Sequence, residues 1–165
     1  MKRYISIVLA LALLFACGCG AKPASPTVSM YDLRVAMEEA DDSLPSMLNA
    51  SSAEENAKEN FSHISEMDYG KVESFFVSYS EEGKADEIAV IAVKDSADTK
   101  EAVESLKEHR TKRYKLLEQY EPEETKRIED GLVFSSGQYA VLIICDNSSA
   151  VKRAFQQAIG GEQTH

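Results

Sequence analysis

The sequence predicts an α+β fold in which two ββα units form a four-stranded antiparallel sheet, with helices packed mainly on one face. Segments with strand character occur as two adjacent pairs, at 72–80 and 86–93 and again at 132–136 and 138–145. Adjacent strands joined by short turns pair antiparallel. Each pair is followed by a segment in which apolar residues recur with helical spacing. Strands and helices in this order favour an α+β architecture, although the strand order stays open.

A first helix is expected to begin at Ser29. Ser29 suits the N-cap position, and Asp32 three residues later approximates a capping box. The helix should end near Asp41, because acidic residues are unfavourable late in a helix. Residues 49–60 are polar and rich in Ala and Glu, which predicts a loop or a weak exposed helix. A short helical turn follows and ends at Gly70, which suits a left-handed cap.

The strand at 86–93 is apolar at consecutive positions from Ile88 onwards. Such a run predicts a central strand, covered on both faces or covered on one and partly buried on the other. Residues 81–84 form the turn before it. Gly137 lies where the second strand pair needs its hairpin turn.

Two helices follow the strand pairs. The longer one is expected at 98–120, with Asp98 as N-cap and Glu101 completing a capping box. Pro122 stops or kinks it. The last helix is capped by Asn147 or Ser148 and ends at a pair of glycines.

The N-terminus has the three-part layout of a secretory signal. Lys2 and Arg3 precede the uncharged residues 4–16, which are too few to span a bilayer, since a spanning helix needs about 20. The four residues ending at Cys17 read Leu-Phe-Ala-Cys and resemble a bacterial lipobox. This resemblance implies cleavage before Cys17 and a diacylglycerol thioether on its sulfur, which carries fatty-acyl chains such as palmitate. Cys19 is the second choice, and an uncleaved anchor is the alternative.

These features divide the chain into four parts. Residues 1–16 are expected to be a lipoprotein signal peptide, and 17–28 a flexible tether of small residues with two prolines. Residues 29–161 should form a single α+β domain, followed by a disordered tail at 162–165. The expected location is the outer face of the cytoplasmic membrane in a Gram-positive-type cell envelope, held by the lipid.

Charge and composition limit the partners and the chemistry. The chain has 28 acidic and 18 basic residues, a formal net charge of −10. An acidic surface repels phosphate backbones, so nucleic acid is not an expected partner. The expected partners are the membrane, through the lipid, and either a cell-envelope protein or a small anionic ligand. No metal-ligand spacing or cofactor motif is present, and Cys145 reads as a small buried residue.

Arg110 is the residue that the helical pattern singles out. It lies seven positions after Val103, in the middle of the apolar stripe of the long helix. A buried guanidinium needs a partner, and Glu87 at the head of a strand is the candidate. The pair is either part of a pocket for an anionic group or a structural ion pair, or the Arg110 stem packs while its head reaches water. Tyr120 and Tyr139 are further candidates for the pocket, or core tyrosines.

Four motifs occur in an order that resembles a known family. They are Ala-Asp-Glu-Ile at 85–88, Arg110 in the long helix, Tyr-Glu-Pro at 120–122 and Gly-Gln-Tyr at 137–139. Over roughly residues 30–158 the chain resembles the DUF4358 domain family, bacterial lipoproteins of uncharacterised function found mostly in Gram-positive Firmicutes. The resemblance implies a lipoprotein and no known activity.

Two functions remain open. The first is a membrane-tethered, non-catalytic binding or envelope-structural domain, which predicts a shallow surface and a sealed pair of Arg110 and Glu87. The alternative is an extracytoplasmic enzyme, such as a hydrolase of cell-envelope material that uses Glu87, which predicts a deep pocket with convergent polar groups. No glycine-rich phosphate loop and no nucleophile elbow is present, so no catalytic residue is assigned.

Overall fold

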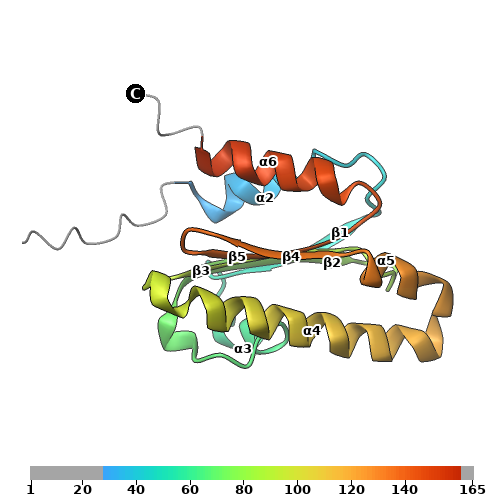
Figure 1. Cartoon of the computed structure of the whole chain (residues 1–165), viewed down its shortest axis with the longest axis horizontal. Coiled ribbons are helices and arrows are strands. Elements are labelled where there is room, and N and C mark those ends of the chain that lie inside the picture. Colours follow the sequence, from blue (N-terminus) through green and yellow to red (C-terminus); the bar gives the residue numbers. More distant parts are fainter. Residues whose placement is uncertain (1–27, 161–165) are drawn as a thin grey trace, which may run out of the picture.

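Five antiparallel strands form one sheet in the order β1-β2-β3-β5-β4. The structure is a computed structural model that describes residues 28–160. Helices lie on both faces of the sheet (Figure 1). The strands are β1 Met47–Ser51, β2 Val72–Ser80, β3 Glu87–Val93, β4 Leu132–Ser136 and β5 Tyr139–Ile144.

The helices are α2 Met30–Glu38, α3 Ala57–Ser62, α4 Thr99–Tyr120, α5 Thr125–Glu129 and α6 Ser148–Gly160. Short 3-10 turns lie at Tyr69–Lys71, Ser96–Asp98 and Pro122–Glu124. Within 28–160, none of the helices has the length and apolar character needed to cross a membrane. The predicted signal peptide, the tail and both candidate lipidation sites, Cys17 and Cys19, lie outside the described residues.

The mixed helix and sheet architecture and the antiparallel pairing are confirmed, but the prediction of four strands is wrong. The additional strand is β1, which pairs with β2 from Met47 opposite Ser80 to Ser51 opposite Phe76. Its sequence, Met-Leu-Asn-Ala-Ser, has neither apolar alternation nor β-branched residues, and only Ala50 is buried. The strand form of β1 therefore comes from its pairing with β2 and not from the pattern of its own residues.

Two hairpins connect the strands that pair in sequence, with a six-residue loop between β2 and β3 and a two-residue turn between β4 and β5. Gly83 between β2 and β3 has φ +77°, and Gly137 between β4 and β5 has φ +55°. Both angles are in the left-handed region, where glycine has no Cβ to clash. The predicted turns at these positions are confirmed.

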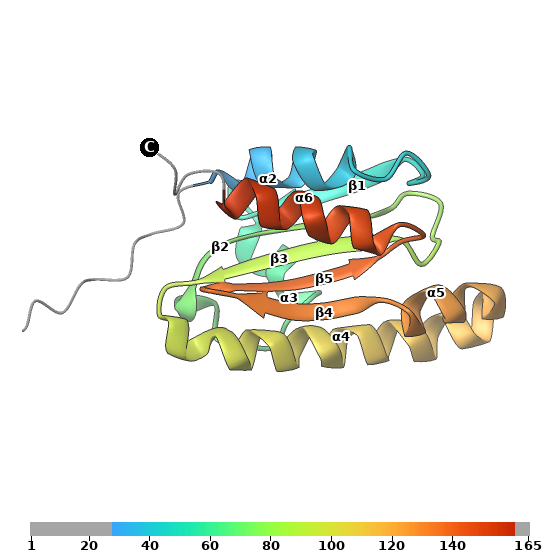
Figure 2. The same ribbon diagram turned by 45° about the horizontal axis from the view of Figure 1, so that its top comes forward.

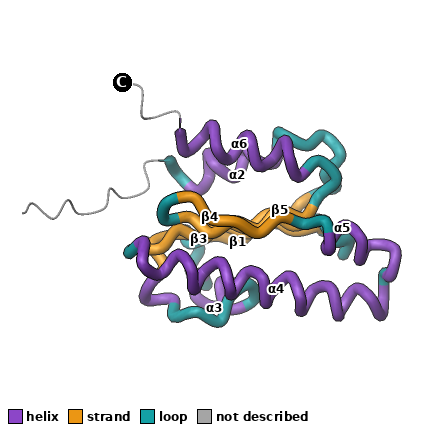
Figure 3. Tube along the Cα trace, viewed as in Figure 1, coloured by secondary structure: helices purple, strands orange, loops and turns teal. Residues whose placement is uncertain are grey.

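Helices cover both faces because the two central strands are buried on both sides. Every residue of β3 and β5 is buried. Successive side chains of a strand point to opposite faces, so Ala89 and Ile91 join one core and Ile88 and Val90 the other. The prediction of helices mainly on one face is therefore wrong: α2 and α6 cover one face, and α3 and α4 the other (Figures 1 and 3).

The face under α2 and α6 is closed by apolar and aromatic side chains. Ser29 caps α2 as predicted, since its hydroxyl accepts a hydrogen bond from the Asp32 backbone N–H. Leu33 from α2 and Phe155 from α6 are completely buried. Phe155 meets the Tyr139 ring edge-on, with the ring centres 5.8 Å apart. The two helices lie side by side over the sheet (Figure 2).

The long helix α4 has nearly its predicted bounds and Asp98 at its N-cap position, but it lacks the predicted capping bond. Asp98 makes no side-chain capping bond. Asp95 instead accepts from the Ala97 N–H and caps the 3-10 turn that leads into the helix. Ala102, Leu106 and Leu117 form the buried stripe of α4.

Gly131, just before β4, is the glycine that packing requires. A Cβ on it would lie 2.9 Å from the Ile144 side chain and 3.0 Å from the Ile128 carbonyl oxygen. We expect Gly131→Ala to lower the free energy of unfolding by about 1–3 kcal/mol, the usual cost of overpacking. Urea denaturation measures the change. Gly160→Ala is the control, because a Cβ there meets open space; equal stability of the two variants would contradict this packing.

Candidate functional site

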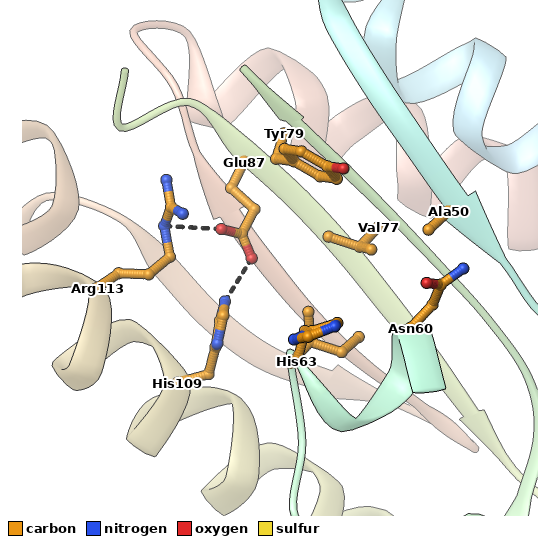
Figure 4. Close-up of a pocket in the computed structure, with 9 residues that line it drawn as sticks. Ala50, Asn60, His63, Val77, Tyr79, Glu87, His109 and Arg113 are labelled. Carbon is orange, nitrogen blue, oxygen red and sulfur yellow. Dashed lines mark hydrogen bonds and ion pairs between the residues drawn. The ribbon is translucent and has the colours of Figure 1, made fainter. Parts of the chain in front are cut away.

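A buried carboxylate lies at the head of the central strand. Glu87 is the first residue of β3, and its side chain is only 2% exposed. A buried charge is stable only when it is paired. One oxygen, Oε1, lies 2.7 Å from Nε2 of His109, and the other, Oε2, lies 2.7 Å from Nε of Arg113 (Figure 4). Both partners come from α4, four residues apart and so on one helix face.

The two contacts differ in kind. An ionised carboxylate only accepts hydrogen bonds, so Nε2 of His109 carries the proton and donates to Glu87. Nε of Arg113 is buried and close to Oε2 but not aligned for a hydrogen bond, so that contact is an ion pair. Nη2 of Arg113 donates to the carbonyl oxygens of Lys84 and Ala85, at 3.2 and 3.3 Å. Arg113 thereby ties α4 to the turn before β3.

The Glu87 cluster forms one end of a pocket of about 290 Å³. This volume is close to the lower end of the range for small-molecule sites, about 300–1,000 Å³. Figure 4 shows His109 and Arg113 on one helix and Asn60 and His63 on the other side, with the strands behind them. The lining residues are Ala50, Asn60, His63, Ile64, Val77, Tyr79, Glu87, His109 and Arg113.

The pocket exists because two helices of unequal length share this face of the sheet. The long helix α4 packs on β5, β4 and β3, whereas α3, with six residues, packs on β1. Strand β2 runs between them, and Val77 and Tyr79 of β2 form the floor and rim of the gap. The mouth is open enough to leave Tyr79 38% exposed.

Some polar groups of the pocket are already engaged and others are not. The Asn60 amide donates to Glu54 at 2.8 Å and exchanges hydrogen bonds with Asn56. Among the residues that the structure describes, neither the His63 ring nor the Tyr79 hydroxyl has a hydrogen-bond partner. These two groups are therefore available to a ligand.

Arg110 does not pair with Glu87, contrary to the candidate pairing. Its Nη1 donates to the Gly131 carbonyl oxygen at 2.7 Å, which joins α4 to the start of β4. Arg110 lines a different hollow, beside Tyr114 and Ile128. Successive side chains on a helix point about 100° apart. Arg110 therefore points away from the helix face that presents His109 and Arg113 to Glu87.

The two tyrosines of the candidate set also lie away from the pocket. Tyr120 ends α4 and is 71% exposed. Tyr139 is buried on the opposite face of the sheet, against Phe155. Of the four residues singled out in the sequence, only Glu87 lines the pocket.

His109 and Arg113 line the pocket beside Glu87, although the sequence pattern did not predict them there. Their spacing of four matches one helix face, and this spacing was the available signal. The apolar stripe of α4 passes through Leu106 and Leu117, and a polar pair beside it is ordinarily solvated. Their burial depends on the position of Glu87, which the sequence pattern does not give.

A second ion cluster surrounds Arg127 of α5. Its Nη1 lies 3.2 Å from Asp86 and 2.7 Å from Glu124, and its Nε lies 2.9 Å from Asp146. Burial raises the pKa of Asp86, and the nearby Arg127 charge opposes that rise. The Glu124 carboxylate also accepts from the Ala85 N–H. This cluster fastens α5 to the start of β3 and is structural.

Cys145 is a free, buried cysteine, as predicted. Burial, with a hydrogen bond to Asp41, raises the pKa of its thiol to about 12. Burial also acts to raise the pKa of Asp41, but hydrogen bonds from Ser43 and the Asn147 N–H outweigh it and lower this pKa overall. Asp41 thus fixes the entry to α6, and the raised pKa of Cys145 disfavours its thiolate form. Within the described part of the chain, no group of three or more His, Cys, Asp or Glu residues is placed to hold a metal.

The described residues define a class of small domain, an antiparallel sheet between two helical layers with a polar pocket beside α4. Residues 46–145 match the family described as Domain of unknown function (DUF4358), and the chain belongs to this family. The matched stretch includes all five strands and the Glu87, His109 and Arg113 cluster. No curated protein and no solved structure matches the chain.

Glu87→Ala tests the buried cluster. It leaves Arg113 and His109 without their carboxylate, and breaking a buried pair costs about 3–5 kcal/mol. Since Arg113 is 22% exposed and can turn toward water, we expect the lower end of that range. Urea denaturation measures it. Glu73→Ala, an exposed glutamate on β2, is the matched control and should change stability by less than about 0.5 kcal/mol. An equal loss in both variants would refute the pairing.

Proposed function

We propose that this protein is a membrane-tethered extracytoplasmic lipoprotein whose domain is a non-catalytic binding module. Its ligand site is the pocket between α3 and α4. The signal-like residues 1–16 and the lipobox resemblance at Cys17 support the anchor. The pocket supports the binding role, because concave sites with a few convergent polar groups are where small molecules bind.

The engagement of Glu87 is the observation that favours binding over catalysis. A general base or nucleophile needs access to the reacting atoms and a free lone pair in the right direction. Glu87 is 2% exposed, and each of its oxygens is opposite a cation or an N–H donor. Its role is to hold His109 and Arg113 in place, which gives a ligand a fixed set of contacts.

The position of the pocket is compatible with an N-terminal anchor. Residue 28 leads into α2, whereas the pocket lies on the α3 and α4 face of the sheet (Figure 1). The tether at 17–28, fully extended, reaches at most about 40 Å. A domain held in this way can turn its pocket away from the membrane.

An extracytoplasmic enzyme, such as a hydrolase of cell-envelope material, is the second candidate. The observation that favours it is the hydrogen bond from His109 to Glu87 at the pocket wall. A carboxylate that fixes one imidazole nitrogen leaves the other as a base. Against this candidate, the pocket lining contains no Ser, Thr or Cys that could serve as a nucleophile. A binding domain releases its ligand unchanged, whereas an enzyme converts it. The fate of the ligand therefore distinguishes the two functions.

Metabolic labelling with a clickable fatty acid tests the anchor. We expect label on the wild-type chain and on Cys19→Ala but not on Cys17→Ala, because the lipobox precedes Cys17. In-gel fluorescence of the purified chain measures it. Label on Cys17→Ala but not on Cys19→Ala would move the lipidation site to Cys19. An unlabelled wild-type chain would refute the proposal of a lipoprotein.

A small-molecule screen by ligand-observed NMR tests the binding site. His63→Trp fills the pocket rim, so compounds that bind the wild-type chain should lose their signal with this variant. Lys58→Trp, on the exposed side of the preceding helix α3, should retain it. Mass spectrometry of each recovered compound distinguishes release from turnover. Compounds that bind all three proteins alike would contradict the site, and a hydrolysed compound would favour the enzyme.

A further inference from the structure

The charges around the pocket differ from those of the chain as a whole. The chain carries a net charge of −10, yet two of its three histidines, together with Arg113, line this one pocket. The only acid in the lining is Glu87, and both of its oxygens are engaged. A ligand therefore meets no free carboxylate there.

The groups that remain available can all donate hydrogen bonds. The Tyr79 hydroxyl and the His63 ring have no hydrogen-bond partners among residues 28–160. The terminal nitrogens of Arg113 are committed only to the two long bonds with Lys84 and Ala85. A guanidinium has five N–H donors, so donors remain on Arg113. The Asn60 amide is used within its own segment.

The rest of the lining is apolar. Ala50 and Val77 come from the sheet (Figure 4), and Ile64 after α3 also lines the pocket. A ligand that fits both parts has an apolar body and one acceptor-rich end. Because Glu87 already offsets the charge of Arg113, a ligand with two negative charges would be repelled by the Glu87 carboxylate more strongly than a ligand with one.

We propose that the pocket binds a small organic acid with one carboxylate and an apolar body. The carboxylate accepts hydrogen bonds from His63 and Tyr79, and the body lies on Ala50, Ile64 and Val77. Hydrogen bonds of this kind to a charged group are about twice as strong as neutral ones. This inference rests on the proposed function, since it names the ligand class of that same pocket.

Benzoate and benzamide, which share a shape and differ in charge, provide the test. Titration of the purified full chain, followed by NMR chemical shifts, should give benzoate an affinity at least about tenfold higher than benzamide. The shifts should map to Ala50, Ile64 and Val77. Inorganic phosphate is the third probe and should bind more weakly than benzoate.

Variants locate the carboxylate. His63→Gln removes an exposed side chain without a structural partner, so the fold is retained, and benzoate affinity should fall about tenfold. Lys115→Gln is the control, because it removes an exposed cation of α4 outside the pocket, and its affinity should equal that of the wild type.

Three results would overturn the inference: equal affinity for benzoate and benzamide, stronger binding of phosphate, or benzoate binding unaffected by His63→Gln. The ligand screen with His63→Trp shows whether only the organic-acid inference fails or whether the proposed binding function fails as well. If neutral compounds occupy the pocket and are lost with His63→Trp, the binding module stands and the organic acid is wrong. If no compound depends on the pocket, both are wrong.

Discussion

The burial of one carboxylate organises this protein. Glu87 begins the central strand with a side chain that is almost completely inaccessible, and an unpaired charge there would cost several kcal/mol. The cost is offset only if α4 presents His109 and Arg113 to it at the same height. The ion pair and hydrogen bond therefore fix how far α4 lies along the sheet and how it is rotated. They also build the polar wall of the pocket.

The second constraint is that β3 and β5 are apolar on both faces. Two helical layers are needed to cover them, and the chain supplies them unequally. On one face α2 and α6 close over the strands, and Leu33 and Phe155 are fully buried. On the other face the short α3 leaves β2 partly uncovered beside α4, and the pocket is the result. The site thus follows from how the core is covered and needs no additional element.

Local sequence patterns predicted the parts of the fold that depend on local structure. The long helix, the Ser29 cap, the hairpin at Gly137 and the buried β3 all follow from spacing, capping and turn chemistry. Strand β1 could not be predicted, because its strand form comes from pairing with β2. The same limit applies to the site. Glu87 was identified, but its partner depends on the rotation of α4, which no local pattern encodes, and Arg110 was chosen in place of Arg113.

A double-mutant cycle between Glu87 and Arg113 tests the central claim most directly. Glu87→Gln, Arg113→Gln and the double variant keep the side-chain volumes close and remove the charges. Urea denaturation of the four proteins gives the coupling free energy. If the pair fixes α4 on the sheet, the coupling should be about 1–3 kcal/mol. Effects that add to within about 0.3 kcal/mol would show that the two residues act independently, and would contradict this account.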